Sequence, residues 1–356
     1  MPVISNMDVT YEDMGGFVDE PPIKLSKHIL TVDQFTKKEL EQFCYKAALH
    51  QSMDSYYFSE SDIPNGLKES NKWHHNGKRW IPNITRNKIM TALFYETSTR
   101  TYASFISAMI QLGGNCIPIQ DARKYSSVSK GETLEDTIRT IESYSDVIVL
   151  RHNENGAADR AAAVATTASI INAGDGTNEH PTQALLDFFT ILIERGWTLY
   201  NGMKIEDVIA GLTVTFMGDL KLGRTVHSLV KLLRAYEVKI NWVSPLALKI
   251  PEEYFKDGDT ETMRLSQVIK ETDVLYVVRT QFERFANAGL PLDSVFSYDV
   301  TTKHMAAAKS NMVLMHPLPR NSEIPTSLDS DPRSAYFRQT KYGLYMRMAV
   351  LQTVLE

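Results

Sequence analysis

The sequence Phe94-Tyr95-Glu96-Thr97-Ser98-Thr99-Arg100-Thr101 joins two segments of opposite character. The apolar run 89–94 before it is typical of a buried strand, and apolar residues recur at helical spacing after Arg100. The hydroxyl-rich stretch is therefore predicted to lie where a strand ends and a helix begins. A helix start presents unpaired N–H groups and a partial positive charge, which favour the binding of anions.

This helix start carries three hydroxyls and a guanidinium, from Ser98, Thr99, Thr101 and Arg100. Together they provide a phosphate cradle that needs no glycine-rich loop. A Ser/Thr N-cap beside a surface arginine would explain the same residues, although capping alone needs only one of them. The spacing by itself leaves both interpretations open.

The whole chain has the length and composition of a two-domain globular protein. Its 356 residues suffice for about two domains with separate cores, and its net charge of −5 provides no basic field for nucleic acid or anionic membranes. No apolar run reaches the roughly 18 residues that span a bilayer. Cys44 and Cys116 match neither a metal-site spacing nor a disulfide framework, so no metal is expected. The first 22 residues lack Lys and Arg, which targeting signals need, so a cytoplasmic location is expected.

From residue 88 onward, short apolar runs alternate with amphipathic stretches. This alternation predicts an α/β fold of two domains, each with a mostly parallel sheet flanked by helices and with a cleft between them. Residues 1–29 are interpreted as an N-terminal extension, 30–181 plus 338–356 as the first domain and 182–337 as the second. The predicted strands are 88–94, 115–119, 146–150, 169–173, 212–217, 238–243, 274–278 and 312–316, and the predicted helices include 31–52, 98–112, 133–144, 157–166, 181–195, 224–236 and 335–355.

Cationic and amide side chains follow the ends of most of these predicted strands. In open α/β sheets, ligands bind beyond the carboxyl ends of the strands. One arginine there is ordinary surface, but so many donors indicate a small polyanionic ligand set in the interdomain cleft. These donors include Arg100, Arg151, His180, Gln183, Arg224, Arg279, Gln281 and Arg320.

Other chemistries fit the sequence less well. The glycines of 218–223 suggest a dinucleotide loop, but the close-packed first two glycines are absent and Lys221 is bulky where backbone must approach a pyrophosphate. His74 and His75 have no third ligand nearby, which disfavours a metal site. No cofactor is expected. The remaining chemistry is group transfer between two anionic substrates by positioning and charge stabilisation.

Four motifs follow one another along residues 30–356. They are Phe94 with Ser98-Thr99-Arg100-Thr101, Asp175-Gly176 with His180-Pro181-Thr182-Gln183, Gly218-Asp219-Leu220 with Gly223-Arg224-Thr225-Val226-His227-Ser228, and His316-Pro317-Leu318-Pro319-Arg320. Together they resemble the signatures of the aspartate carbamoyltransferase family. The resemblance implies transfer of the carbamoyl group of carbamoyl phosphate to L-aspartate in de novo pyrimidine synthesis, with 30–181 plus 338–356 binding carbamoyl phosphate and 182–337 binding aspartate.

The resemblance also assigns roles to individual residues. Ser98, Thr99, Arg100 and Thr101 match the phosphate-binding loop. Arg151, His180 and Gln183 match the residues that hold the carbamoyl group and polarise its carbonyl. Arg224, Arg279 and Gln281 match the positions that grip the aspartate carboxylates, and Pro317 and Leu318 match backbone carbonyls that orient the amino group. Arg100, Thr101, Arg151, His180 and Lys130 are the residues expected to take part in catalysis.

The loop 126–133 resembles the one that family members donate to the active site of a neighbouring subunit. Ser126 and Lys130 would then complete a shared site, Lys130 on the aspartate side, and a homotrimer is the expected minimum unit. A loop that merely caps the helix after Thr133 fits the sequence equally well. The resemblance also leaves open an association with other enzymes of pyrimidine synthesis.

Two rival functions remain. Ornithine carbamoyltransferases usually carry a cysteine in the motif that here reads His316-Pro317-Leu318-Pro319, and they need acidic groups for a cationic side chain, whereas Arg279 and Gln281 here await an anion. A catalytically silent paralogue that serves as a scaffold or ligand-binding module usually lacks some substrate-contacting residues. Every such residue expected from the resemblance is present in this chain.

Overall fold

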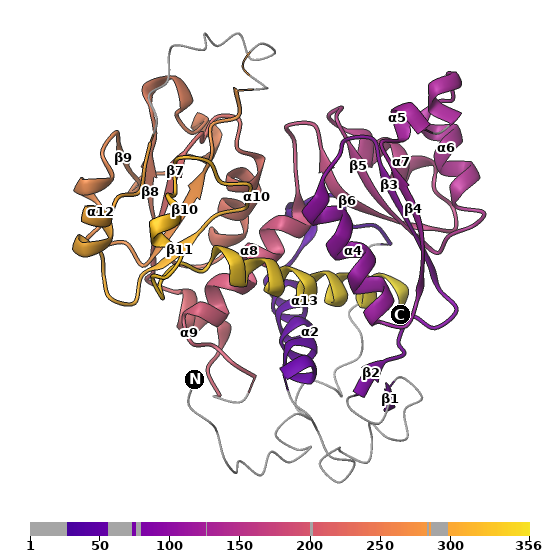
Figure 1. Ribbon diagram of the computed structural model, residues 1–356, viewed down its shortest axis with the longest axis horizontal. Helices are drawn as coiled ribbons and strands as arrows, with labels where there is room; N and C mark the ends of the chain where they lie inside the picture. The colour runs from indigo at the N-terminus through magenta and orange to yellow at the C-terminus, as the bar shows by residue number, and fades with distance from the viewer. Residues whose placement is uncertain are drawn as a thin grey trace.

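The computed structural model describes residues 27–55, 73–75, 80–125, 127–199, 202–282, 285 and 298–356. It forms two α/β halves, each built around its own sheet, with long helices between them (Figure 1). The extension predicted at 1–29 lies outside these ranges except for its last three residues. Of these, Ile29 is fully buried and forms a parallel bridge with Ile171.

The first half contains a four-stranded parallel sheet in the order β4-β3-β5-β6. The inner strands β3 and β5 are buried along almost their whole length, which explains their unbroken apolar runs. The sheet strands are β3 (Ile89–Phe94), β4 (Asn115–Gln120), β5 (Val147–His152) and β6 (Ser169–Asp175), and the connecting helices are α4 (Thr99–Gln111), α5 (Ala122–Tyr125), η3 (Ser127–Lys130), α6 (Leu134–Ile141) and α7 (Ala157–Val164).

The second half contains a five-stranded parallel sheet in the order β11-β10-β7-β8-β9. The edge strand β9 was not predicted, because its three residues are polar and largely exposed. The strands are β7 (Thr213–Gly218), β8 (Lys239–Val243), β9 (Thr260–Thr262), β10 (Val274–Val278) and β11 (Val313–Met315), and the helices are α10 (Arg224–Leu233), η4 (Leu246–Leu248), η5 (Glu252–Tyr254), η6 (Leu265–Gln267), α12 (Thr302–Ala307) and η9 (Thr326–Leu328).

Long helices join the two halves. Helix α13 (Tyr336–Leu355) packs against α2 (Lys37–Ser55), α4 and α8 (Pro181–Glu194), and α8 packs in turn against α10 of the second half and against the short α9 (Ile205–Ile209). Figure 1 shows α13, in yellow, crossing the middle of the molecule below both sheets. One continuous apolar core includes residues of both sheets and of these helices. The predicted α/β fold with two sheet domains is confirmed, while the bounds proposed for each domain stay a prediction.

The single helix predicted over 31–52 is wrong at its start. A short turn η1 (Val32–Gln34) comes first, Phe35 is extended, and α2 begins only at Lys37. The cause is a local capping box, in which the Gln34 side chain accepts hydrogen bonds from the backbone N–H groups of Leu30 and Thr31 at 2.8 and 3.2 Å. Outside the two large sheets, β1 (Trp73–His75) and β2 (Trp80–Pro82) form an antiparallel pair. Among the described residues, no helix has the length and apolar character needed to cross a bilayer.

Candidate active site

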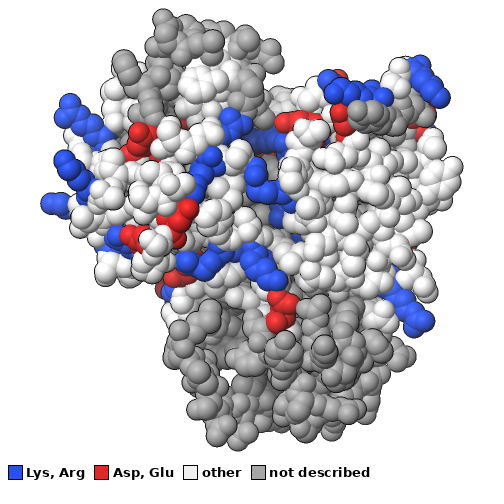
Figure 2. All heavy atoms as spheres, in the orientation of Figure 1, with Lys and Arg blue, Asp and Glu red and all other residues white. Residues whose placement is uncertain are grey.

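A cavity of about 790 Å³ lies between the two halves. Lys and Arg side chains gather in the hollow where it opens (Figure 2). The structure brings together almost all of the predicted site residues along its wall, namely Ser98, Thr99, Arg100, Thr101, Arg151, His180, Gln183, Arg224, Arg279, Gln281, Pro317 and Leu318.

The start of α4 forms one wall of the cavity. Ser98 is the N-cap residue, yet its side chain makes no capping hydrogen bond. Ser98 thus occupies the N-cap position that the capping interpretation gives it, but its hydroxyl does not cap the helix, and the residue lines the cavity. Partial burial lowers the pKa of the neighbouring Arg100, and the positive charges of Arg151 and Arg279 lower it further. Several cations thus act on the same space, which favours an anionic ligand.

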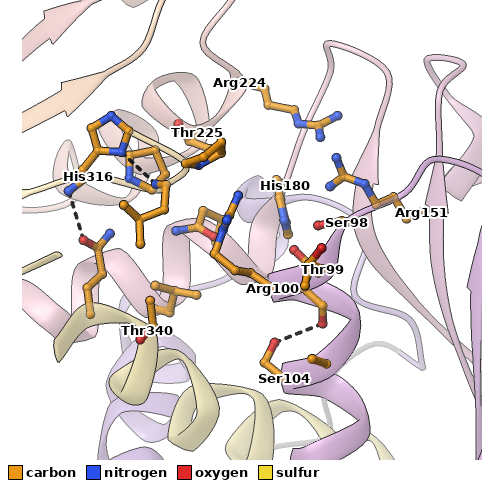
Figure 3. A pocket seen from close by; sticks show the side chains of 18 of the residues that line it. Ser98, Thr99, Arg100, Ser104, Arg151, His180, Arg224, Thr225, His316 and Thr340 are labelled. Carbon is orange, nitrogen blue, oxygen red and sulfur yellow. Dashed lines mark hydrogen bonds between the residues drawn. The ribbon is translucent and has the colours of Figure 1, made fainter. Parts of the chain in front are cut away.

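Arg151 and Arg224 come from different halves and share one carboxylate. Arg151 lies 3.2 Å from Glu96 and Arg224 lies 3.9 Å from the other oxygen of the same carboxylate. Arg151 also donates to the Ala173 carbonyl at 3.1 Å. Their guanidinium groups point toward one another beside the His180 ring (Figure 3). Glu96 was not predicted as a site residue, although it lies within the stretch 94–101 that carries the phosphate cradle.

Gly174 in β6 makes the close approach of these arginines possible. It has a φ of 112°, and a Cβ atom there would lie 3.0 Å from an Arg151 nitrogen and 3.1 Å from the Arg224 guanidinium carbon. Any side chain would therefore push both guanidinium groups from their places. The requirement for glycine is imposed by packing and by backbone conformation together.

His180 is buried at the N-terminus of α8, one residue before Pro181. Burial holds its pKa well below the ordinary value, and the nearby charges of Arg224, Arg151 and Arg347 lower it further. The ring is therefore neutral at physiological pH and keeps one N–H donor. A neutral donor suits a carbonyl oxygen on which negative charge develops, because the proton is shared without being given up.

Gln183 lies one turn later on α8, and a buried carboxylate of the same helix orients its side chain. Its side-chain amide donates to Asp187 at 2.9 Å, and the same buried carboxylate accepts hydrogen bonds from Gln339 and Tyr276, both at 2.6 Å. Burial raises the pKa of Asp187 to about 7. This carboxylate thus links α8, β10 and α13 beneath the cavity.

The aspartate side of the predicted site lies at the end of β10. The Gln281 side chain donates to the Leu222 carbonyl at 2.8 Å, and its backbone N–H donates to Asp219 at 3.1 Å. Arg279 donates to the Thr280 carbonyl at 3.2 Å. These contacts fix the loop so that both side chains line the cavity.

The turn after β11 follows the strand that neighbours β10 in the same parallel sheet. Leu318 has a φ of 54°, which is rare for a residue with a side chain, and its backbone N–H donates to His316 Nδ1 at 2.8 Å. His316 in turn is hydrogen bonded to Glu323 at 2.9 Å. Uncommon backbone conformations of this kind concentrate at binding sites, where neighbouring contacts hold them.

The glycines of 218–223 serve packing. A Cβ atom at Gly218 would lie 2.0 Å from the Val278 carbonyl oxygen, and one at Gly223 would lie 2.5 Å from that of Asp219. The first glycine lets β7 pair with β10, and the second lets α10 begin where Arg224 reaches the cavity. These constraints account for both glycines without a nucleotide.

One predicted residue that the structure describes, Lys130, is not among those that line the cavity, and it is exposed at the end of η3. Ser126 lies outside the described residues. The cavity also has residues that the sequence did not single out, of which Arg347 is the clearest. This arginine is buried on α13, and burial lowers its pKa to about 10. Its only sequence signal is a cation in an otherwise apolar part of a helix.

We expect the His180 ring to remain neutral at about pH 6, because its folded-state pKa lies below the ordinary value near 6.5. As pH falls, this histidine takes up a proton in the unfolded chain before it does so in the folded protein. Its contribution therefore lowers the free energy of unfolding as pH falls below about 6.5. Titration of ¹⁵N-histidine-labelled protein by NMR, with a His180→Asn variant for assignment, measures this pKa. An inflection between about pH 6 and 7 for His180 would contradict the expected burial effect.

Comparisons with known proteins agree with this geometry. Residues 27–192 match the model of the aspartate/ornithine carbamoyltransferase carbamoyl-P binding domain, and residues 210–354 match that of the Asp/Orn binding domain. The chain belongs to the aspartate/ornithine carbamoyltransferase family. Within it, the chain is 47% identical over 277 residues to the aspartate carbamoyltransferase catalytic subunit of Thermoplasma volcanium, which covers 76% of this chain and 87% of the relative.

The chain is also similar to a longer relative and to a solved structure. The multifunctional protein pyr1-3 of Dictyostelium discoideum is 46% identical over 277 residues, which cover 76% of this chain but only 12% of that protein. The chain therefore spans a small part of such multifunctional relatives. The crystal structure of Trypanosoma cruzi aspartate transcarbamoylase in complex with N-(phosphonacetyl)-L-aspartic acid (PALA) superposes with a TM-score of 0.77 and 38% identity, covering 95% of this chain and 98% of that one.

Proposed function

We propose that this chain transfers the carbamoyl group of carbamoyl phosphate to L-aspartate, giving N-carbamoyl-L-aspartate and phosphate, in de novo pyrimidine synthesis. The observation that carries the proposal is a single cavity with anion-binding groups from both halves. The start of α4 provides a phosphate cradle on one side. Arg224, Arg279 and Gln281 provide donors for carboxylates on the other.

The geometry suggests how the reaction proceeds. With the phosphate at the start of α4, the carbamoyl carbonyl faces Arg151 and the neutral His180. The unprotonated amine of aspartate forms a bond to the carbonyl carbon, and the developing negative charge on the oxygen is stabilised by these donors. The bond from carbon to the phosphate oxygen then breaks, and the leaving phosphate takes a proton from the former amine. Most of the rate enhancement comes from positioning and charge, because the side chains form no covalent bond.

A phosphate-release assay with carbamoyl phosphate tests this proposal, run in parallel with L-aspartate and with L-ornithine. We expect phosphate release when L-aspartate is the acceptor and none when L-ornithine is the acceptor. The only acidic side chain among the cavity-lining residues that the structure describes is Glu96, which is engaged by Arg151 and Arg224. No such carboxylate remains for the side-chain ammonium of ornithine. Ornithine turnover above aspartate turnover would overturn the assignment, and binding of PALA without any turnover would instead indicate a silent paralogue.

We further propose that the chain acts as a homotrimer with shared active sites, in which the exposed Lys130 of one subunit enters the cavity of the next. The position of Lys130 supports this, since it does not line the cavity of its own chain. The predicted partner Ser126 lies outside the described residues. A cytoplasmic location and an association with other pyrimidine enzymes stay predictions from the sequence.

Mixing two inactive variants tests the sharing of sites. A Lys130→Ala chain and an Arg100→Ala chain are each expected to be nearly inactive, whereas mixed trimers contain some sites with both residues intact. In trimers formed at equal amounts, about a quarter of the sites have two unmodified contributions, so activity is expected to recover to about that fraction. The measurement is phosphate release after joint refolding. Absence of any recovery in trimers shown to be mixed by mass would contradict the sharing.

A further inference from the structure

The buried carboxylate of Glu179 lies directly before His180 and is fully engaged. Its Oε1 atom accepts a hydrogen bond from Lys231 at 2.6 Å. Its Oε2 atom accepts one from the backbone N–H of Val32 at 3.1 Å and one from the Ser228 hydroxyl at 3.3 Å. The Glu179 side chain is 7% exposed. Three separate segments, η1, the loop before α8 and α10, are thus tied to one carboxylate.

This network reaches the His180 backbone. The backbone N–H of His180 donates to the Ser228 hydroxyl at 3.3 Å, and that hydroxyl donates onward to Glu179. His180 also adjoins Glu179 in the chain. A displacement of the carboxylate would therefore move the residue that presents its ring to the carbamoyl group.

The same network reaches Arg224. Residues 224, 228 and 231 are spaced by four and three positions along α10, so they share one face of the helix. Arg224 lies at the first position and lines the cavity, while Ser228 and Lys231 hold Glu179. The carboxylate therefore connects the histidine of one half with the helix that carries an arginine of the other half.

Lys231 keeps the network charged. Although burial opposes the ammonium charge, hydrogen bonds to Asp33 and Glu179 raise the pKa of Lys231. The carboxylate of Asp33 lies 2.5 Å from Lys231 Nζ, but the Asp33 side chain is 60% exposed, whereas that of Glu179 is buried. A buried carboxylate without its cation is strongly unfavourable, so the buried member of this triad holds its geometry more firmly than the exposed one.

We propose that Glu179 is a positioning residue for the carbamoyl transfer: through Ser228 and Lys231 it sets His180 in register with Arg224. The inference rests on the proposed function and deepens it, since it names the group that aligns the two halves of the site. Glu179 does not line the cavity. Its effect is expected in kcat, because His180 acts on charge that develops in the transition state.

The test compares Glu179→Gln with wild type and with Asp33→Asn. Glutamine keeps the size and an oxygen acceptor but removes the charge that faces Lys231. We expect Glu179→Gln to lower kcat about tenfold with little change in the KM for carbamoyl phosphate, and Asp33→Asn to change kcat by less than about twofold. Ser228→Ala, which cuts the link to His180 while leaving the ion pair, is expected to lower kcat several-fold. The Ser228→Ala variant remains informative if Glu179→Gln folds poorly.

A double-mutant cycle separates positioning from general stabilisation. In a His180→Ala background, Glu179→Gln is expected to change kcat by less than about twofold, because the group that it positions is gone. An equal loss in both backgrounds, or a kcat within twofold of wild type for both Glu179→Gln and Ser228→Ala, would overturn the proposal. The same four proteins can also be compared by their affinity for PALA, measured by calorimetric titration. If wild type shows no turnover, the proposed function fails, while the PALA cycle still decides the role of Glu179.

Discussion

Replacement of Arg100 by alanine is expected to lower kcat/KM for carbamoyl phosphate by about 10²- to 10³-fold, the loss of roughly 3 to 4 kcal/mol of transition-state stabilisation. Arg100 lies in the first turn of α4, where the helix N-terminus and the hydroxyls of Ser98 and Thr101 face the same cavity. As the leaving phosphate gains charge, a guanidinium at this helix start is expected to stabilise it. Steady-state phosphate release measures the effect.

Arg139→Ala provides the matched control for this experiment. Arg139 is an exposed arginine on α6 that pairs with Asp136 at 3.0 Å, and it is not among the residues that line the cavity. Exposed pairs of this kind contribute about 0.2 to 1 kcal/mol to stability, so activity should stay near that of wild type. A loss below about tenfold for Arg100→Ala, with the fold intact by circular dichroism, would show that Arg100 does not contact the phosphate.

Replacement of Arg279 by alanine is expected to raise the KM for aspartate by about 10- to 150-fold, since a charge-assisted hydrogen-bonded pair with a carboxylate contributes about 1.5 to 3 kcal/mol. Arg279 follows β10 in the second half and lines the cavity. The affinity for inorganic phosphate, measured as competitive inhibition against carbamoyl phosphate, should change little. The two measurements together separate the aspartate side of the cavity from the phosphate side.

Arg279→Lys sharpens this second experiment. Lysine keeps the positive charge but lacks the planar fork that contacts both oxygens of a carboxylate, so a KM between those of wild type and Arg279→Ala is expected. Equal aspartate KM values for all three proteins would remove Arg279 from the aspartate site. A parallel loss of phosphate affinity in Arg279→Ala would instead indicate that the residue supports the whole cavity.

Glu96 changes the electrostatic description of the site. The sequence indicates an excess of cations that await two anions, but the structure shows a carboxylate already shared by Arg151 and Arg224. These arginines come from β5 in one half and α10 in the other. The Glu96 carboxylate therefore reduces the repulsion between two like charges and bridges the halves at the cavity itself.

Periodicity and motif order predicted most of the fold and the wall of the cavity. The run 89–94 and the helix after Arg100 were recognisable because a buried parallel strand is continuously apolar and a packed helix repeats at 3.6 residues. The donors at the strand ends followed from the rule that parallel strands direct their carboxyl ends to one edge. The single helix at 31–52 failed, since a side-chain cap at Gln34 competes with the helix in a way that the apolar spacing does not reveal.

Local sequence by itself determined the strands, the helices and the chemical character of the groups at their ends, because those properties depend on neighbours within a few residues. Tertiary structure alone decided which charges meet. The pairing of Glu96 with arginines from both halves, and the contact of Glu179 with Lys231 from α10, join residues more than 50 positions apart. Such contacts depend on how two sheets are placed around α8 and α13, and that placement is set by the packing of the shared core.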